Sequence, residues 1–591
     1  MKREKQKDNN RFVLVSIFLI IILGFAIYAN SLDGQFIWDD VHLVRDNLNI
    51  RSPSNILKIF TTNVTPSMRQ SFSFYRPLMI FTYALDYYFW KLNVRGYHLT
   101  NTILHILAAL GLYWLISIIF KDNFLSLLAS LLFVAHPIHT EAVTYISGRA
   151  DPLAAIFIIL CCVFYIKQLE NRSIGNYVLM IISCLLALFS KENSLILPML
   201  LLIYHYSFKK KFALREFLSI IVITLVFAVV RFTFLKLIVG SIVSETSLLQ
   251  RAAGFFVAIV SYNRLMVLPF NLHMEYVLRL FAFSVPKVIG GIILLISLLI
   301  YAIKARNKNT LMSFSILWFF IALFPVSNLY PINAYMAERW LYLPSIGFFL
   351  IVAKALTSLF RIRRFRVVSL MFIISLLSFY SLLTVKQNEY WQEPISFFER
   401  TLRYVKNSPR LYYNLGCLYQ DTGEHKEAIA LYNKAIQINP KHAETYHNLG
   451  SVYGDIGKHE EAIVFYKKTL QIDPEYAQAY NNLGIAYNNT GKYEEAIVFS
   501  NKALEVDPEY AEAYNNLAVV CNNIGRYEEE IVLYKKALQV NPEYTRAYNN
   551  LATAYYNKEE YDLAIQHCDK AIELGHNVNP KLIEALKPFR Q

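Results

Sequence analysis

The sequence predicts an all-α chain in two parts, a polytopic membrane domain at residues 1–386 and a solenoid of helical repeats at residues 387–591. Two observations predict this division. The first part consists of long apolar runs separated by short polar segments, which is the pattern of bilayer-spanning helices. The second part is polar, rich in Tyr and Asn, and repeats itself every 34 residues, which is the pattern of stacked helix pairs.

Twelve apolar runs in the first part are candidates for spanning helices, which need about 20 mostly apolar residues. Alternation places every Lys/Arg cluster on the cytoplasmic side only if one run does not cross. The run 251–268 is the best exception, because Asn263, Arg264 and Pro269 interrupt it. We therefore expect about 11 crossings, with the repeats on the outer side. The runs are 12–30, 97–120, 123–136, 152–167, 174–190, 194–208, 217–239, 251–268, 287–303, 310–328, 340–358 and 367–386.

This topology collects the polar motifs of the membrane domain on its outer face. Charged groups are costly at a bilayer unless they are hydrated, paired or used, so we expect a catalytic centre there. Outer loop one (31–96) carries the adjacent carboxylates, and outer loop two (136–151) is rich in His and charged residues. The motifs are Asp39 and Asp40, then His136, His139, Glu141 and Arg149, then Lys191 and Glu192, and finally Glu338 and Arg339.

Asp39 and Asp40 are candidate general bases, since a carboxylate accepts the proton of an attacking hydroxyl. Two neighbouring like charges raise one of the two pKa values, which separates their roles. The alternative is that the pair caps a short helix or forms a hydrated turn. The residues leave open which of the two carboxylates acts.

Arg339, Lys191 and Arg149 are candidates for binding a phosphate. A guanidinium binds phosphate through two parallel N–H groups, and a departing phosphate needs such charge stabilisation. Arg339 follows Glu338 at a turn rich in Tyr and Trp, directly before a predicted spanning helix. For Lys191 the alternative is contact with lipid headgroups.

His136, His139 and Glu141 have a spacing that permits metal binding. However, Pro137 favours a bent turn, and the sequence fixes no third strong ligand. We expect a hydrogen-bonding loop that shapes a polar active-site cavity together with Glu192 and Glu338. No cofactor is predicted, and the sequence does not support a divalent metal. The net charge of +14 does not indicate nucleic-acid binding, because the basic residues flank apolar runs.

The second part contains tetratricopeptide repeats, which have a 34-residue period and a helix–turn–helix pattern. We expect five full repeats at 408–577, preceded by a half repeat at 389–405 and followed by a capping helix at 580–590. The recurring residues are Gly423, Gly457, Gly491 and Gly525 at the turn within each repeat, and Pro440, Pro474, Pro508 and Pro542 at the start of the next.

One position of the repeats is a candidate for binding the acceptor peptide. An Asn precedes the recurring Leu of the first helix in each repeat, and a row of amides can hydrogen-bond an extended peptide backbone. The alternative is that each Asn satisfies neighbouring helix ends. The row consists of Asn414, Asn448, Asn482, Asn516 and Asn550.

Three segments resemble, in order, the transmembrane and tetratricopeptide-repeat-containing O-mannosyltransferases. They are HPIHTEAVTYISGRAD (136–151), KENSLILPML (191–200) and AERWLYLPSIGF (337–348). The resemblance also includes the Asp-Asp pair after the first helix and covers essentially the whole chain. It implies a GT-C type glycosyltransferase fold with a catalytic Asp in the first outer loop. It also implies a polyprenyl- or dolichyl-phosphate-linked mannose donor that is used with inversion.

The resemblance leads us to expect a protein O-mannosyltransferase whose repeats hold the acceptor protein. Its partners would be membrane lipid, the lipid-linked sugar and the acceptor, and no nucleic acid. The chain has fewer repeats than the eukaryotic members and no retention signal at its end, so we expect a bacterial homologue with its repeats outside the inner membrane. A eukaryotic protein would place them in the endoplasmic reticulum lumen. The alternatives are another sugar, a glycan or lipid acceptor, or a non-catalytic membrane scaffold.

Overall fold

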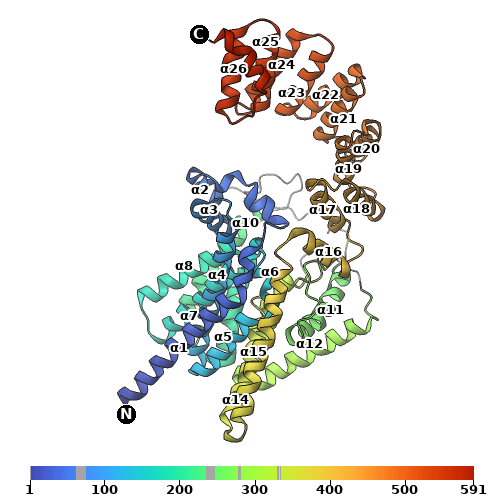
Figure 1. The fold of residues 1–591 in the computed structure, drawn as a ribbon. Coiled ribbons are helices and arrows are strands. Elements are labelled where there is room, and N and C mark those ends of the chain that lie inside the picture. The colour runs from blue at the N-terminus through green and yellow to red at the C-terminus, as the bar shows by residue number, and fades with distance from the viewer. Residues whose placement is uncertain are drawn as a thin grey trace. The chain divides into compact units, whose positions relative to one another are not determined.

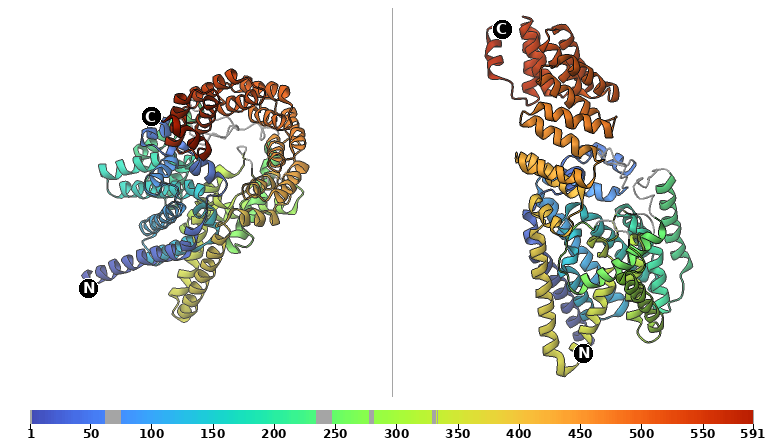
Figure 2. Two further views of the ribbon diagram at one scale, coloured as in Figure 1. Left: turned by 45° about the horizontal axis from the view of Figure 1, so that its top comes forward. Right: turned by 90° about the vertical axis from the view of Figure 1, so that its right-hand side faces the viewer.

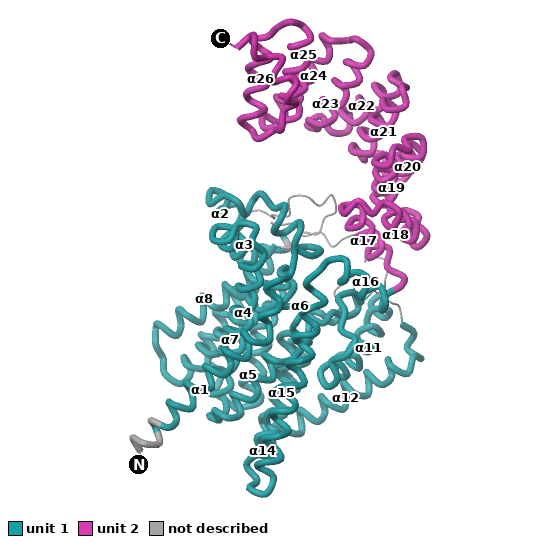
Figure 3. Tube along the Cα trace, viewed as in Figure 1, with its two compact units in different colours: residues 1–405 teal, residues 406–591 magenta. Residues whose placement is uncertain are grey.

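The structure is a computed structural model that describes residues 2–61, 75–233, 247–276, 281–328, 332 and 334–590. It divides into two compact units, residues 1–405 and residues 406–591 (Figure 3). Within the described ranges the regular structure is helical and includes no β-strand. The all-α prediction is therefore confirmed. Parts of the expected outer loop one (31–96) and of the expected run 217–239 lie outside the described residues.

Unit 1 is a bundle of apolar helices (Figure 1). Its helices are α1 (Lys2–Tyr28), α2 (Ile56–Thr61), α3 (Pro77–Trp90), α4 (Val94–Phe120), α5 (Asn123–Ala135), α6 (Thr140–Val143), α7 (Ala150–Glu170), α8 (Ile174–Ser190), α9 (Leu197–Phe208), α10 (Leu214–Thr233), α11 (Leu248–Val267), α12 (Pro286–Ala305), α13 (Thr310–Leu323), α14 (Ser345–Arg361), α15 (Arg366–Glu389) and α16 (Pro394–Tyr404).

Five helices among the described residues are long and apolar enough to cross a membrane. A sixth span results if α5 and the segment Pro137–Val143, which meet at an angle of 55°, count as one broken span. The bend follows from Pro137, because the residue before a proline is driven out of the helical conformation. Several other expected runs form helices of 12 to 17 residues, such as α9 and α14. The length and composition of the described helices thus support fewer membrane crossings than the predicted 11. The number of crossings stays a prediction.

The core of unit 1 includes buried side chains of α4, α5, α7, α8, α9, α13 and α14, with α7 and α8 lying side by side (Figure 1). The first helix of the unit, α1, packs against α4, α5 and the late helix α15 (Figure 2). The ends of α1 and α15 therefore meet. As a result, the loop that follows α1 lies next to the segment that follows α15.

Unit 2 consists of consecutive helix pairs that follow an arc (Figure 2). The pairs are α17 (Pro409–Asp421) and α18 (His425–Ile438), α19 (Ala443–Asp455) and α20 (His459–Ile472), α21 (Ala477–Asn489) and α22 (Tyr493–Val506), α23 (Ala511–Asn523) and α24 (Tyr527–Val540), and α25 (Thr545–Asn557) and α26 (Tyr561–Glu573), followed by α27 (Pro580–Leu586).

The turn between the two helices of a repeat requires a left-handed residue. The four recurring glycines have φ angles between 75° and 80°, which glycine adopts without steric cost. At the equivalent position of the fifth repeat the residue is Glu559, with a φ of 65°. The expected capping helix is formed by α27, and Phe589 beyond it stacks on Tyr561 of the last repeat, with ring centroids 3.5 Å apart.

The segment 389–405, which the sequence predicts to be a half repeat of the solenoid, belongs to unit 1 in the structure. Helix α16 begins at Pro394 and falls within unit 1, so the boundary between the units follows residue 405. The physical reason is that Phe397 and Phe398 are buried and pack on Trp38 of the loop after α1.

Candidate active site

The loop after α1 carries the two adjacent carboxylates in different surroundings. Trp38 directly precedes the two carboxylates. Its φ of 57° lies in the left-handed region, which a residue with a bulky side chain adopts only when neighbouring groups hold it there. Asp40 is only 1% exposed, and its Oδ2 accepts a hydrogen bond from the Ile37 N–H at 3.2 Å. Asp39 is half-buried. The fold thus separates the two acids, one inside the protein and one at its surface.

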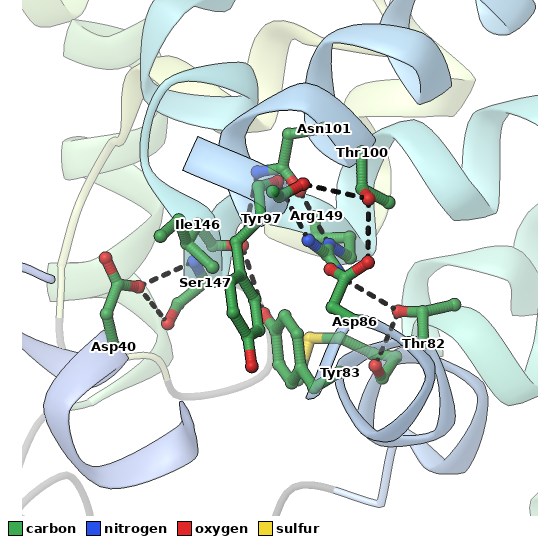
Figure 4. Close-up of polar contacts among 12 residues, drawn as sticks. Asp40, Thr82, Tyr83, Asp86, Tyr97, Thr100, Asn101, Ile146, Ser147 and Arg149 are labelled. Carbon is green, nitrogen blue, oxygen red and sulfur yellow. Dashed lines mark hydrogen bonds and ion pairs between the residues drawn. The ribbon is translucent and has the colours of Figure 1, made fainter. Parts of the chain in front are cut away.

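Ser147 of outer loop two donates two hydrogen bonds to Asp40 (Figure 4). Its backbone N–H lies 2.7 Å and its hydroxyl 2.5 Å from Oδ1 of Asp40. Burial raises the pKa of Asp40 to about 7, even though the hydrogen bonds from Ser147 and Ile37 favour the charged form. Asp40 therefore joins the two outer loops.

A buried ion pair holds outer loop two from the other side (Figure 4). Nη1 of Arg149 lies 2.6 Å from Oδ2 of Asp86 on α3, and its Nε donates to the Asn101 side chain at 2.6 Å. The amide of Asn101 in turn donates to the carbonyl oxygens of Val143, Tyr145 and Ile146. This network fixes the Ile146–Arg149 turn that presents Ser147 to Asp40.

The sequence predicts that Arg149 binds a donor phosphate, whereas in this structure its guanidinium is bonded to protein groups. Arg149 is 0% exposed. Its remaining donors serve Thr82 and the carbonyl oxygen of Tyr97, and its guanidinium lies over the Tyr83 ring. A guanidinium paired in this way has no free edge for a ligand. The sequence carries no information about this partner of Arg149 on α3.

Arg339 is held by Glu141. Its backbone N–H and its Nη1 donate to the two oxygens of the buried Glu141 carboxylate, at 2.8 Å and 2.6 Å. About a third of the Arg339 side chain, 32%, stays exposed. Burial opposes its charge, but Glu141 and then the weaker effects of Tyr145, Asp151 and Asp39 raise the pKa of Arg339. The side chain is therefore a fixed cation within electrostatic range of Asp39.

Two further cations lie in the same charged group. Nζ of Lys191 contacts Asp151 at 2.6 Å, and the Arg76 guanidinium contacts both oxygens of Glu192, at 2.5 Å and 3.0 Å. Burial opposes the ionisation of Glu192, but the charge of Arg76 outweighs it and holds the pKa of Glu192 well below its usual range. We call Arg76, Lys191 and Arg339, with Asp151, Glu141 and Glu192, the charged cluster.

The structure thus brings Glu141, Lys191, Glu192 and Arg339 together, although up to 198 residues separate them in sequence. Sequence reasoning missed Arg76, whose partner Glu192 lies 116 residues away. It also missed Asp86 and Ser147. No periodic pattern marks these residues, so only the folded chain reveals them.

The two histidines of outer loop two are buried structural residues. Nε2 of His136 lies 3.1 Å from the Met266 carbonyl oxygen, and the ring packs on Tyr380. Nδ1 of His139 lies 2.8 Å from the Phe133 carbonyl oxygen, and its Nε2 lies 3.0 Å from the Ser345 hydroxyl. These contacts fit the expected hydrogen-bonding loop. Within the described ranges, no group of three His, Cys, Asp or Glu side chains is arranged to hold a metal ion.

Glu338 turns away from its neighbour Arg339. Its Oε1 accepts hydrogen bonds from the His273 N–H at 2.6 Å and from the Tyr276 hydroxyl at 2.7 Å. Burial, reinforced by the charge of Glu141, raises the pKa of Glu338. The prediction placed this residue in the active-site loop, and the structure gives it the task of fixing the segment that follows α11.

Four members of the Asn row, Asn448, Asn482, Asn516 and Asn550, are part of a continuous chain of side-chain hydrogen bonds. Asn516 donates to Asn481 of the preceding repeat, and Asn550 donates to Asn515, each at 3.0 Å. Asn481 and Asn515 donate in turn to their chain neighbours in the row. Towards the first repeat the chain continues through Asn482, His447 and Asn448 to Tyr413 and Cys417. The amides thus bond between repeats rather than to helix ends, and peptide binding by the row stays a prediction.

Comparisons with known proteins agree with both parts of the chain. Tetratricopeptide repeat models match residues 407–475, 475–543 and 545–577, which confirms the predicted repeats. The chain is 28% identical over 442 residues to the protein O-mannosyl-transferase F38B6.6 of Caenorhabditis elegans, covering 70% of this chain and 61% of that protein. It is 27% identical over 471 residues to the protein O-mannosyl-transferase TMTC3 of Homo sapiens, covering 71% and 51%.

The chain is therefore similar to proteins named protein O-mannosyl-transferases. The resemblance of its three motifs is thereby confirmed, and so is its character as a membrane protein with repeats. The chain spans only about half to three fifths of the length of these relatives. Among solved structures, it matches the crystal structure of MamA at 32% identity, covering 27% of this chain and 94% of that chain, with a TM-score of 0.25.

Proposed function

We propose that the protein is a membrane-embedded O-mannosyltransferase that moves mannose from a polyprenyl- or dolichyl-phosphate donor to Ser or Thr of a protein, with inversion. The observation that carries this proposal is that outer loop two holds both groups: the Tyr145 hydroxyl accepts the N–H of the half-buried Asp39, and Glu141 binds the backbone and side chain of Arg339. Sugar transfer from a lipid phosphate needs these two groups together, a base for the acceptor and a cation for the departing phosphate.

In the proposed reaction Asp39 accepts the proton of the acceptor hydroxyl. The hydroxyl oxygen forms a bond to the anomeric carbon of mannose, on the face opposite the phosphate. The bond between that carbon and the phosphate oxygen breaks, and the lipid phosphate leaves with the electron pair. Arg339 stabilises the phosphate, with Lys191 and Arg76 adding positive charge to the charged cluster.

The geometry favours Asp39 over Asp40 as the base. A general base must reach the proton that it removes, to about 3 Å or through one water. Asp40 is buried and accepts three hydrogen bonds from Ile37 and Ser147. Asp39 is half-buried, and its backbone N–H is held by the Tyr145 hydroxyl at 3.2 Å. We assign Asp40 the task of joining the two outer loops.

The repeats are proposed to bind the acceptor polypeptide, as tetratricopeptide repeats commonly bind peptides in their concave groove. The donor's lipid tail would lie among the apolar helices of unit 1. The active site would face the side opposite the cytoplasm, which is the endoplasmic reticulum lumen or the bacterial periplasm. A bacterial source stays a prediction, and the relatives named above are animal proteins.

The deciding experiment supplies purified full-length protein with polyprenyl-phosphate mannose and Ser/Thr-containing acceptor proteins. We expect mannose on the acceptor, a loss of at least about 100-fold in Asp39→Asn and a smaller loss, about tenfold, in Asp40→Asn. The reverse ranking would make Asp40 the base. Donor that is never consumed by the wild type would contradict the proposal.

The alternative class is a non-catalytic membrane scaffold. It predicts that Asp39→Asn affects only the expression level, and it gives the charged cluster no function. Another sugar, or a glycan or lipid acceptor, is tested in the same assay by exchanging the donor and the acceptor.

A further inference from the structure

The segment 388–398, which joins α15 to α16, touches both outer loops of the candidate active site. It follows the last long helix of unit 1 and precedes the first full repeat by ten residues in sequence. Its residues Asn388, Trp391, Phe397 and Phe398 are all at most 3% exposed. Such burial is unusual for a connection on its way to a peptide-binding solenoid, since connecting segments normally run over the surface.

The first set of contacts fixes the start of outer loop one. The amide of Asn388 donates to the Ile27 carbonyl oxygen at 2.9 Å and to the Asn30 side chain at 3.0 Å. The Gln392 amide donates to the Asn30 carbonyl oxygen at 2.7 Å, and the Gln392 carbonyl oxygen accepts from the Gln35 N–H at 3.1 Å. These bonds hold the backbone from the end of α1 to four residues before Asp39.

The second set of contacts reaches the catalytic pair itself. The ring of Phe398 stacks on Trp38, with centroids 5.3 Å apart and planes 20° apart. Trp391 stacks on Tyr145, at 5.3 Å and 28°, and the Tyr145 hydroxyl accepts the Asp39 N–H. Asn388 also accepts the Thr144 hydroxyl at 2.7 Å. Outer loop two is thereby held by the same segment.

We propose that the 388–398 segment is a positioning element of the active site, in which Asn388, Trp391 and Phe398 set the conformation of the loop that carries Asp39 and Asp40. The left-handed Trp38 supports this assignment, since a strained backbone persists only where neighbouring groups hold it. Displacement of Asp39 by about 1 Å would be enough to lower transfer strongly. The activity measurement rests on the proposed function, whereas the structural measurement does not.

The structural test is hydrogen exchange, measured by mass spectrometry on the full-length protein in detergent. Phe398→Ala should increase exchange of the backbone amides at 35–41 about tenfold. The matched control is Tyr466→Ala, which removes a buried ring at the same repeat position, 68 residues later. It should leave exchange at 35–41 unchanged. No change in Phe398→Ala, or an equal change in the control, overturns the proposal.

The activity test uses a short peptide acceptor, so that delivery by the repeats does not limit the rate. We expect Phe398→Ala to lower kcat at least about tenfold while the donor KM stays within about twofold. Phe398→Leu keeps most of the buried volume and should restore folding if Phe398→Ala is unstable. An acceptor KM effect without a kcat effect would assign the segment to acceptor delivery. A wild type that transfers no mannose would contradict the proposed function, and hydrogen exchange would still decide this inference.

Discussion

Arg339 contacts both oxygens of Glu141, through its backbone N–H at 2.8 Å and through Nη1 at 2.6 Å. One carboxylate therefore fixes both the backbone and the side chain of the same residue. The buried acid belongs to outer loop two, and the cation precedes α14, so the contact also joins two segments that are distant in sequence. The orientation of the cation relative to Asp39 depends on this pairing.

Glu141→Gln is expected to lower transfer by about 10- to 100-fold and to raise the donor KM. The amide keeps one acceptor oxygen but turns an NH2 group towards Arg339 and removes the charge that orients it. Arg339→Lys should be as damaging, because lysine cannot bond both the carboxylate and a phosphate edge. The control is Asp122→Asn, which alters the pair between Asp122 and the exposed Arg361 next to the first residue of α5. Steady-state kinetics on all three variants test the role.

Asp40 should make the stability of the protein depend on pH. Its pKa is raised to about 7 in the folded protein, so the neutral form is favoured by folding. Its contribution to stability is therefore complete below about pH 4 and is lost as the pH rises through 7. Asp40→Asn should raise the Tm at pH 8 and flatten its change between pH 5 and pH 8.

The control for this pH effect is Asp46→Asn. The hydrogen bond from Arg45 lowers the pKa of Asp46, so its contribution is present at neutral pH and is lost as the pH falls. Asp46 is largely exposed, so the effect of its removal should be small and opposite in sign. If Asp40→Asn and the wild type have the same Tm at every pH, the raised pKa of the buried Asp40 carboxyl does not control the pH dependence of stability.

Arg149→Ala and Asp86→Asn are expected to destabilise the protein to a similar extent. Removing one partner of a buried ion pair leaves the other uncompensated, which costs about 3–5 kcal/mol. A role of Arg149 in donor binding would instead affect the donor KM in Arg149→Ala alone. Thermal unfolding of the two variants, together with their KM values at permissive temperature, separates these explanations.

Glu559→Gly is expected to stabilise the fifth repeat by about 0.5–1 kcal/mol. Glu559 occupies the left-handed turn position that glycine fills in the other four repeats, and a side chain is strained there. Gly525→Ala, the opposite change one repeat earlier, should destabilise by a similar amount. Hydrogen exchange of α25 and α26 measures the first effect, and that of α23 and α24 measures the second. Equal signs for the two variants would exclude this explanation.

Asn516→Ala is expected to destabilise unit 2 by about 1 kcal/mol, the usual net value of one hydrogen bond. Because the amide bonds Asn481 of the preceding repeat, a double-mutant cycle with Asn481→Ala should show coupling of about 0.5–1.5 kcal/mol. The cycle between Asn516 and the distant Asn448 should show none. Chemical denaturation of the four proteins of each cycle supplies the values.

The repeats were predictable almost to the residue because each one carries its own signals. The glycine turn, the proline start and the 34-residue period are local, and together they set both helices of a repeat. The shared site residues were also predictable as a group, since Asp39, Lys191 and Arg339 all occur in polar breaks between apolar runs. The predicted alternation of spans would place these particular breaks on one face.

The individual roles were not predictable, because they depend on partners that sequence does not pair. Arg149 looked like Arg339, a cation in an outer loop, and only Asp86 on α3 distinguishes the two. Ser147 and Arg76 carry no pattern of their own. The spanning helices were less certain for a different reason, since short apolar runs such as α9 suit the core of a bundle as well as a bilayer.

The hydrogen-bonded chain of Asn side chains has a consequence for how this protein can change its length in evolution. The pair Asn515 and Asn516 bonds only the adjacent repeats: Asn516 donates to Asn481 one repeat earlier, and Asn515 accepts from Asn550 one repeat later. Duplication or loss of one whole repeat therefore leaves every amide with a partner. An insertion of any other length would break the row. The hydrogen-bonded amides thus permit insertions and deletions of 34 residues and disfavour insertions of any other length.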